Sequence, residues 1–261
     1  MLLKMKFNHL KQILYLLIGV ILPLLSFAGG QSDVLFAKGN AYYAKAQYEE
    51  ALTTYQGLLQ GNHQSAVVYF NMGNASYKLG DIPSALLYYE KAHKLSPGDE
   101  DINFNLKLAG LKTVDKIDEV PQFFMSSWWT NFILSFSAGT FSVLSIVLVL
   151  LGSAFLILYF FSAVVAVKKS SFYFSILLFF LGILTVFIAS SQVSYFKNHR
   201  QAIIFSSPVN VKSEPAERAK LLFVIHDGTK VNILESSNDW IKIGLANGNV
   251  GWIKGTDLKE I

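Results

Sequence analysis

The sequence contains no cysteine and has few charged residues for its length. The absence of cysteine excludes disulfide bonds, thiolate metal sites and a cysteine nucleophile. Asp, Glu, Lys and Arg make up 15% of the 261 residues, against about 25% in an average soluble domain. The deficit is concentrated in residues 120–167 and 170–196, which carry no charged side chain. We therefore expect a membrane protein.

The charge that remains does not favour nucleic acid as a partner. Residues 29–127 contain 8 basic and 11 acidic side chains, and residues 201–261 contain 7 of each. Neither region has the excess of lysine and arginine that binding to a phosphate backbone requires. We expect no nucleic acid among the partners.

The sequence also lacks the motifs of the common enzyme classes. It has no H-E-x-x-H, no P-loop, no G-x-G-x-x-G and no nucleophile elbow. The histidines stand apart from one another, with no second ligand at the spacing of a metal site; they are His9, His63, His93, His199 and His226. We expect no enzyme, no catalytic residue, no cofactor and no metal.

Residues 1–28 have the features of a signal peptide. Three lysines precede an apolar run, which ends before Ser26-Phe27-Ala28, with small residues at the two positions that a signal peptidase reads. We predict cleavage after Ala28; the alternative is an uncleaved anchor. In both cases residue 30 onward is exported, which places the following domain in the periplasm.

The uncharged region is too long for a single membrane span. As one helix, residues 120–167 would extend about 70 Å, against a hydrocarbon core of about 30 Å. In residues 120–138 apolar side chains recur every fourth position, which predicts an interfacial amphipathic segment with Trp128 and Trp129 at headgroup level. The alternative is that this segment is the extended start of the first span.

Residues 139–196 are predicted to form two transmembrane helices with a turn at 168–171, where Lys168 and Lys169 interrupt the apolar sequence. Small residues recur every seven positions in both helices, as Ala138-Ser145-Gly152 and Ser175-Gly182-Ala189. They form either a stripe along which the two helices pack or a chance scatter. Neither span contains an ionisable residue, which argues against transport.

An internal repeat of 34 residues precedes the membrane region. Its matching pairs are Phe36 and Phe70, Gly39 and Gly73, Asn40 and Asn74, Ala51 and Ala85, and Tyr55 and Tyr89. The pattern resembles the tetratricopeptide repeat, in which small residues let two helices approach closely and aromatic residues fill the space beside them. The resemblance implies an all-α domain over residues 29–119, with two repeats and a closing helix.

The first helices of such repeats line a concave groove that binds partner peptides. The groove residues predicted here are Phe36, Asn40, Tyr43, Phe70, Asn74, Tyr77, Phe104 and Leu108. Two alternatives stay open: the phenylalanines also fit a core between repeats, and the amides of Asn40 and Asn74 fit either peptide contact or support of a neighbouring helix. The lysines and arginine of the carboxylate-binding variant of this family are missing.

Residues 201–261 change to a period of two, with short strands between Gly, Asn, Asp and Ser turns, which predicts a small all-β barrel. The segment resembles the bacterial SH3-type domain through Val209-Asn210-Val211, His226-Asp227-Gly228-Thr229 and Gly251-Trp252-Ile253. That resemblance implies association with cell-wall peptides or partner proteins. Trp240 and Trp252 are candidate binding platforms on the barrel surface, and the alternative is that at least one of them is core.

The order of the parts is similar to the BatE proteins of the Bacteroidetes aerotolerance operon. The resemblance implies a multi-pass protein of the cytoplasmic membrane, with its repeat and barrel domains in the periplasm. It further implies a membrane complex with members that carry von Willebrand A-type domains. The function we expect is a membrane-anchored scaffold for protein–protein interaction. The alternative is a cell-wall sensor in which the barrel binds peptidoglycan peptides.

Overall fold

The structure, a computed structural model, describes residues 31–60, 64–118, 120–121 and 123–261. The predicted signal peptide, His9 and His63 lie outside these residues. The described chain divides into two compact units, one with residues 31–34 and Ser145–Ile183, and the other with Leu35–Leu144 and Leu184–Ile261. The predicted fold class is confirmed, because the described chain has helical repeats, two long apolar helices and a small antiparallel β domain.

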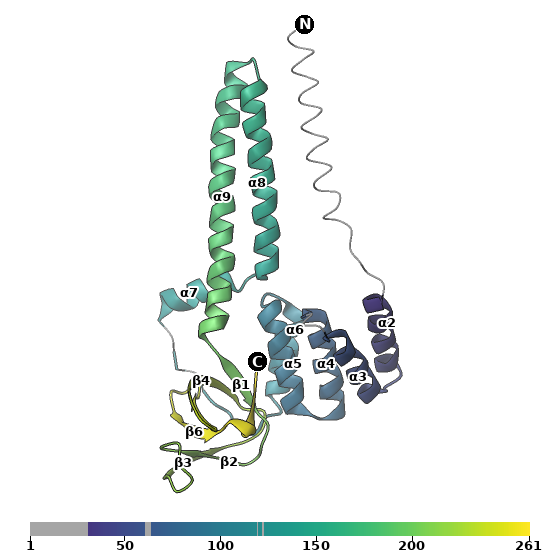
Figure 1. The fold of residues 1–261 in the computed structure, drawn as a ribbon, viewed down its shortest axis with the longest axis vertical. Helices are drawn as coiled ribbons and strands as arrows, with labels where there is room; N and C mark the ends of the chain where they lie inside the picture. Colours follow the sequence, from purple (N-terminus) through teal and green to yellow (C-terminus); the bar gives the residue numbers. More distant parts are fainter. Residues whose placement is uncertain (1–30, 61–63, 119, 122) are drawn as a thin grey trace. The chain divides into compact units, whose positions relative to one another are not determined.

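Five helices form the described part of the repeat region (Figure 1). They are α2 (Gln31–Ala44), α3 (Tyr48–Leu58), α4 (Ala66–Leu79), α5 (Ile82–Leu95) and α6 (Glu100–Gly110). Asp81 accepts a hydrogen bond from Ser84 N and Asp99 accepts two at the start of α6, so both aspartates cap the helices that follow them. Gly80 ends α4 with a φ of 80°, which an L side chain adopts only with strain.

The repeat spacing is explained by how each helix pair packs. A Cβ atom on Gly39 would lie within 2.4 Å of the Tyr55 ring, and a Cβ atom on Gly73 within 2.5 Å of the Tyr89 ring. Glycine is therefore needed at both places for the tyrosine of the second helix to lie against the backbone of the first. Both tyrosines are almost completely buried.

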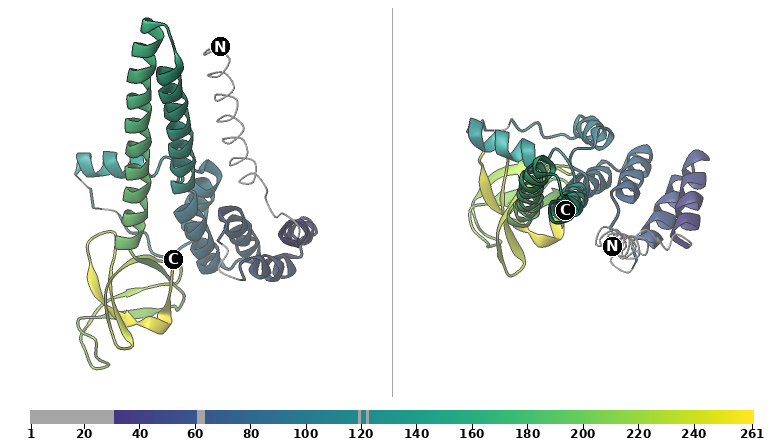
Figure 2. Two further views of the ribbon diagram at one scale, coloured as in Figure 1. Left: turned by 45° about the horizontal axis from the view of Figure 1, so that its top comes forward. Right: turned by 90° about the horizontal axis from the view of Figure 1, so that it is seen from above.

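Two long helices, α8 (Ala138–Phe161) and α9 (Val165–Asn198), lie side by side (Figures 1 and 2). Both are long and apolar enough to cross a membrane. The small-residue stripe is confirmed as a packing surface, because Ser145 Oγ donates to Gly182 O at 3.0 Å and Ser175 Oγ donates to Gly152 O at 2.9 Å.

The turn between the two helices differs from the prediction of 168–171, which was wrong. The helices are interrupted at residues 162–164, where Ser162 Oγ accepts a hydrogen bond from Val164 N at 3.2 Å and replaces helical bonding. Lys168 N already donates to Val164 O, so both lysines belong to the first turns of α9. Lysine and serine are compatible with a helix, and their polarity alone did not locate the turn.

The short helix α7 (Phe124–Ile133) lies within the predicted amphipathic segment and precedes α8. Its residue Ile133 is buried in a cluster with Phe141 of α8 and with Ile188 and Ala189 of α9. These residues all belong to the second compact unit.

The C-terminal region is a single antiparallel sheet in the order β3-β2-β6-β5-β4-β1-β7. The strands are β1 (Gln201–Ile204), β2 (Val209–Lys212), β3 (Leu221–Ile225), β4 (Lys230–Ser237), β5 (Trp240–Gly244), β6 (Val250–Lys254) and β7 (Leu258–Glu260). The sheet curves around one core (Figure 2), to which residues from six of the strands contribute, among them Ile204, Val211, Ile225 and Ile253. Sequence analysis did not single out β1.

Candidate partner-binding site

Two asparagines of the predicted groove belong to a hydrogen-bond ladder that joins successive helices. Asn40 Oδ1 on α2 accepts from Tyr55 Oη on α3 at 2.7 Å and from Asn71 Nδ2 on α4 at 3.2 Å. The ladder therefore holds the first helices of the two repeats, α2 and α4, within hydrogen-bond distance of each other.

The same ladder occurs one repeat later. Asn74 Oδ1 on α4 accepts from Tyr89 Oη on α5 at 2.7 Å and from Asn105 Nδ2 on α6 at 3.2 Å. Sequence analysis missed Asn71 and Asn105, although these residues are also 34 positions apart. The face shared by α2, α4 and α6 is thus built from one repeated set of polar contacts.

The ladder leaves one kind of hydrogen-bonding group unused. The Oδ1 atom of each groove asparagine accepts two hydrogen bonds, whereas the Nδ2 groups of Asn40 and Asn74 have no partner among the described residues. Burial raises the pKa of both tyrosines, Tyr55 and Tyr89, so each phenol stays protonated and donates to its asparagine. The asparagines combine a structural acceptor with an available donor.

The other groove residues divide into two groups. Phe36, Tyr43, Phe70 and Tyr77 are half-buried and pack against the repeat cores, with the rings of Phe36 and Tyr55 centred 6.2 Å apart and those of Phe70 and Tyr89 5.9 Å apart. Phe104 is 66% exposed and Leu108 is also exposed, although both lie on the closing helix α6. The aromatic stripe is therefore part core and part surface.

The two tryptophans of the β domain have different surroundings. Trp252 is 8% exposed and belongs to the buried residues of the sheet. Trp240 is half-buried, with Lys212 Nζ 5.2 Å and Lys254 Nζ 5.9 Å from its ring centre. Both lysines also contact the Glu217 carboxylate, which lowers the pKa of that carboxyl. Only Trp240 has the exposure that a binding platform needs.

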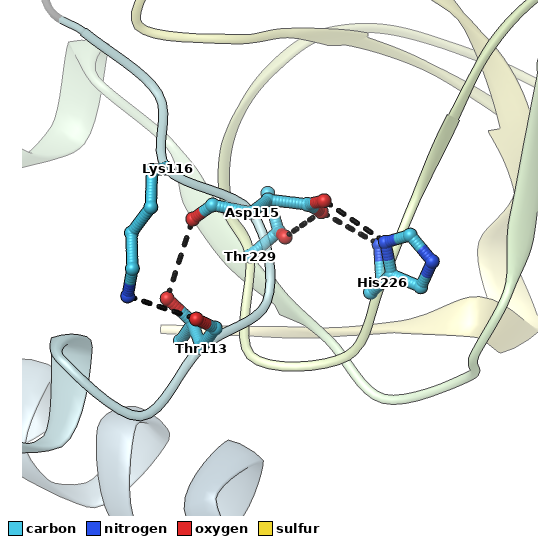
Figure 3. A network of polar contacts seen from close by, with 5 residues as sticks. All are labelled: Thr113, Asp115, Lys116, His226 and Thr229. Carbon is cyan, nitrogen blue, oxygen red and sulfur yellow. Dashed lines mark hydrogen bonds and ion pairs between the residues drawn. The ribbon is translucent and has the colours of Figure 1, made fainter.

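A polar network connects the chain after α6 with the β domain, and sequence analysis missed it (Figure 3). Asp115 Oδ2 accepts from His226 N at 2.7 Å and from Thr229 Oγ1 at 2.6 Å, and Asp115 Oδ1 lies 2.9 Å from His226 Nδ1. On the same segment Lys116 Nζ donates to Thr113 O at 2.8 Å. Asp115 is 111 residues from His226, and neither residue has a sequence spacing that signals this contact.

The Asp115 carboxyl is stabilised in its ionised form. Burial by itself raises its pKa, but the hydrogen bonds from Thr229 and His226 outweigh burial, and the pKa lies below its ordinary value. The network therefore favours the charged form of Asp115.

Apolar and ionic contacts complete the junction between the repeats and the β domain. Ile203 of β1 is buried in the cluster formed by Leu86, Tyr89 and Ala109. Lys230 Nζ lies 2.7 Å from the Glu90 carboxylate, which is itself buried. Strand β1, which sequence analysis overlooked, thus packs against helix α5.

A cavity of about 240 Å³ lies beside this junction, lined by Gln64, Tyr69, Lys91, Lys94, Leu95, Glu260 and Ile261. Burial lowers the pKa of Lys91, and the nearby Lys94 and Lys259 lower it further. Within the part of the chain that the structure describes, no group of three or more His, Asp or Glu side chains is placed to hold a metal ion.

Families of known proteins match separate parts of the chain. A family described as TPR repeat matches residues 39–80, and a family described as tetratricopeptide repeat matches residues 66–99. A family described as bacterial SH3 domain matches residues 207–259. The chain therefore contains tetratricopeptide repeats and a bacterial SH3 domain, which are modules typical of interaction rather than catalysis. No curated protein sequence matches the chain.

Similar solved structures cover parts of the chain at low identity. PcrH in complex with the chaperone binding region of PopB is 15% identical, with a TM-score of 0.31, over 57% of this chain and 98% of that chain. The Sgt2 TPR domain from Aspergillus fumigatus is 14% identical, with a TM-score of 0.31, over 65% of this chain and 83% of that chain. An NlpC/P60 family protein from Bacillus cereus is 17% identical, with a TM-score of 0.21, over 27% of this chain and 23% of that chain. At these TM-scores the similarities carry no argument about partners.

Proposed function

We propose that this protein is a membrane-anchored interaction scaffold, without a catalytic step, whose repeat helices bind an extended segment of a partner protein. The binding face is the one shared by α2, α4 and α6. Asn40 and Asn74 donate their Nδ2 groups to backbone carbonyls of the partner, and Phe104 and Leu108 contact its apolar side chains.

The availability of two repeated amide donors is the observation that carries this proposal. Their acceptor oxygens are held by Tyr55 and Asn71 and by Tyr89 and Asn105, so both amides are fixed in place before a partner arrives. A donor that is already oriented loses less entropy when it binds. The family matches to tetratricopeptide repeats support the same assignment.

Replacement of the two asparagines by aspartate tests the proposal selectively. A carboxylate still accepts the hydrogen bonds of the ladder, but it has no N–H to donate. We expect the full chain with Asn40→Asp and Asn74→Asp to fold and to lose the partner that wild-type protein retains after mild cross-linking in membranes. Gln56→Glu with Gln60→Glu is the control, because it makes the same charge change at exposed positions on and just after α3. Retention of the partner by the aspartate variant would contradict the proposal.

The location that we propose is the cytoplasmic membrane, with α8 and α9 as spans and both soluble regions in the periplasm. The length and composition of the two helices support the anchoring, and the bacterial SH3 domain supports an exported location. The order of the modules supports membership of the BatE proteins, and hence a membrane complex with von Willebrand A-type members. Alkaline phosphatase fused after Val120 or after Ile261 is expected to be active at both positions, and activity at only one would overturn this topology.

A cell-wall sensor is the second candidate, and Trp240 is the observation that favours it. This half-buried ring lies near the Nζ atoms of Lys212 and Lys254 on the β domain, and its exposed part can contact a sugar or peptide. Under this alternative the full chain would be retained on peptidoglycan, and Trp240→Ala would abolish the retention. Under our proposal Trp240→Ala leaves partner binding unchanged.

A further inference from the structure

Helix α7 exposes an unusually apolar surface. Phe124 is 75% exposed and Trp128 is 57% exposed, and Phe123, Met125 and Phe132 are exposed as well. The Trp128 and Phe132 rings stack on each other, with centres 5.9 Å apart, one helical turn apart on this surface. We call these five residues the α7 aromatic face. Exposed apolar surface of this kind marks a site where a protein binds another protein or a membrane.

The opposite side of α7 is fixed to α9. Ile133 is buried against Ile188, and the Trp129 ring lies 6.3 Å from that of Phe187. Gln192 of α9, which is 2% exposed, donates its Nε2 to Ile133 O at 2.5 Å and to Phe136 O at 2.7 Å. These carbonyls lie at and just beyond the C-terminal end of α7, where a helix leaves acceptors unsatisfied. The buried amide therefore holds α7 in one orientation on α9.

We infer that the α7 aromatic face binds the headgroup region of the lipid bilayer and forms a collar at the periplasmic end of α8 and α9. Because Gln192 and Ile133 attach α7 to the C-terminal part of α9, the collar adds a second membrane contact to the anchoring by the two spans. This inference rests on the proposed anchoring of the chain by α8 and α9.

Lipid is the occupant that the sequence and the helix order favour. Residues 120–167, which include all of α7 and α8, contain no charged side chain, so α7 belongs to the same uncharged stretch of sequence as the proposed span α8. Aromatic side chains, tryptophan above all, are enriched at the boundary between hydrocarbon and headgroups. The exposed polar side chains of α7, Ser126 and Asn131, carry hydroxyl and amide groups that headgroups can solvate.

Quenching of tryptophan emission by brominated lipid tests this inference. The full chain is reconstituted into vesicles of phosphatidylethanolamine and phosphatidylglycerol that contain phosphatidylcholine brominated either near the headgroup or near the ends of the acyl chains. Two of the four tryptophans lie in α7, so we expect the shallow bromines to quench roughly half of the emission and the deep bromines to quench much less. Trp128→Phe with Trp129→Phe should remove the quenched component, whereas Trp240→Phe should leave it in place.

The results of this experiment show whether lipid or a second copy of the chain covers the α7 aromatic face. A chain that floats with the vesicles without preferential quenching of Trp128 and Trp129 by shallow bromines overturns the lipid collar and leaves the anchoring intact. A chain that does not float overturns the anchoring by α8 and α9, and the collar with it. Because the protein has no cysteine, Phe124→Cys introduces a single thiol. Efficient disulfide dimers of that variant in the same vesicles, without quenching, would assign the face to a second copy of the chain.

Discussion

In the repeat helices, the polar side chains Asn40 and Asn74 are held in place by the fold but keep their amino groups available. In the β domain, Trp252 is covered by its neighbours, and Trp240 lies near two lysines that form ion pairs with Glu217. From the sequence, the repeat region was expected to offer aromatic and amide binding groups, and the β domain was expected to offer two tryptophans. Among the predicted residues, the repeat region thus presents two oriented amide donors and the exposed Phe104, whereas the β domain presents only Trp240, which is why we assign partner binding to the repeats.

The largest effect is expected for the buried tryptophan of the β domain. Trp252→Ala removes a large core side chain and should cost about 3–5 kcal/mol of the stability of the β domain. Trp240→Ala, at a half-buried position, should cost clearly less. Hydrogen exchange of the full chain, resolved by region, measures both losses. If both variants lost the same stability, Trp240 would be as important for the core as Trp252, and the contrast between the two tryptophans would be wrong.

A methyl group at a repeat glycine tests how closely the helices pack. Gly73→Ala places a Cβ atom 2.5 Å from the buried Tyr89 ring, and we expect a loss of about 1–3 kcal/mol in the repeat helices. Gly57→Ala on α3 is the matched control, because its Cβ atom would have no atom within 4 Å apart from its chain neighbours and the backbone of its own helix. It should be neutral or stabilise the helix by up to about 1 kcal/mol. Regional hydrogen exchange again gives the measurement.

The ladder and the proposed donor can be separated at one residue. Asn74→Ala leaves the buried hydroxyl of Tyr89 without its acceptor and should cost about 1–3 kcal/mol, whereas Asn74→Asp keeps the acceptor and should change stability by less than about 0.5 kcal/mol. Thermal unfolding of the two variants makes the comparison. A large loss of stability in the aspartate variant would show that the Nδ2 group of Asn74 also stabilises the fold.

The smallest loss of stability is expected at Asp115, which connects the chain after the repeat helices with the β domain. Since the folded pKa of Asp115 is lowered, its contribution to stability is present above the ordinary aspartate pKa of about 3.9 and is lost as the pH falls through the folded value. Asp115→Asn should therefore flatten the acid side of the stability profile, with a cost of about 1 kcal/mol near neutral pH. Acid unfolding followed by tryptophan emission tests this, and an unchanged acid profile would contradict it.

Local sequence patterns predicted much of the fold. The 34-residue repeat predicted the paired helices, and the period of two after residue 201 predicted the strands. The small-residue stripe also identified the packing of α8 on α9, because close approach of two backbones requires small side chains at regular spacing.

Contacts between distant segments were not predictable in the same way. Asp115 and His226 come from segments with no shared pattern, and Ile203 looks like any β-strand residue although it packs into a helical cluster. Gln192 lies in a long apolar helix, where one amide gives no hint of the two carbonyls that it binds. For Asn40 and Asn74, the repeat spacing indicated importance, and only the contacts of each atom separated structural acceptor from available donor.

The central claim is that the partner lies on the face shared by α2, α4 and α6, and site-specific photo-crosslinking in living cells tests it most directly. Benzoylphenylalanine replaces Phe104 in one strain and the exposed Leu222 of the β domain in another. We predict a specific protein adduct at Phe104 that disappears when Asn40→Asp and Asn74→Asp are added, and no adduct at Leu222. An adduct at Leu222 with none at Phe104 would contradict the account and move partner binding to the β domain.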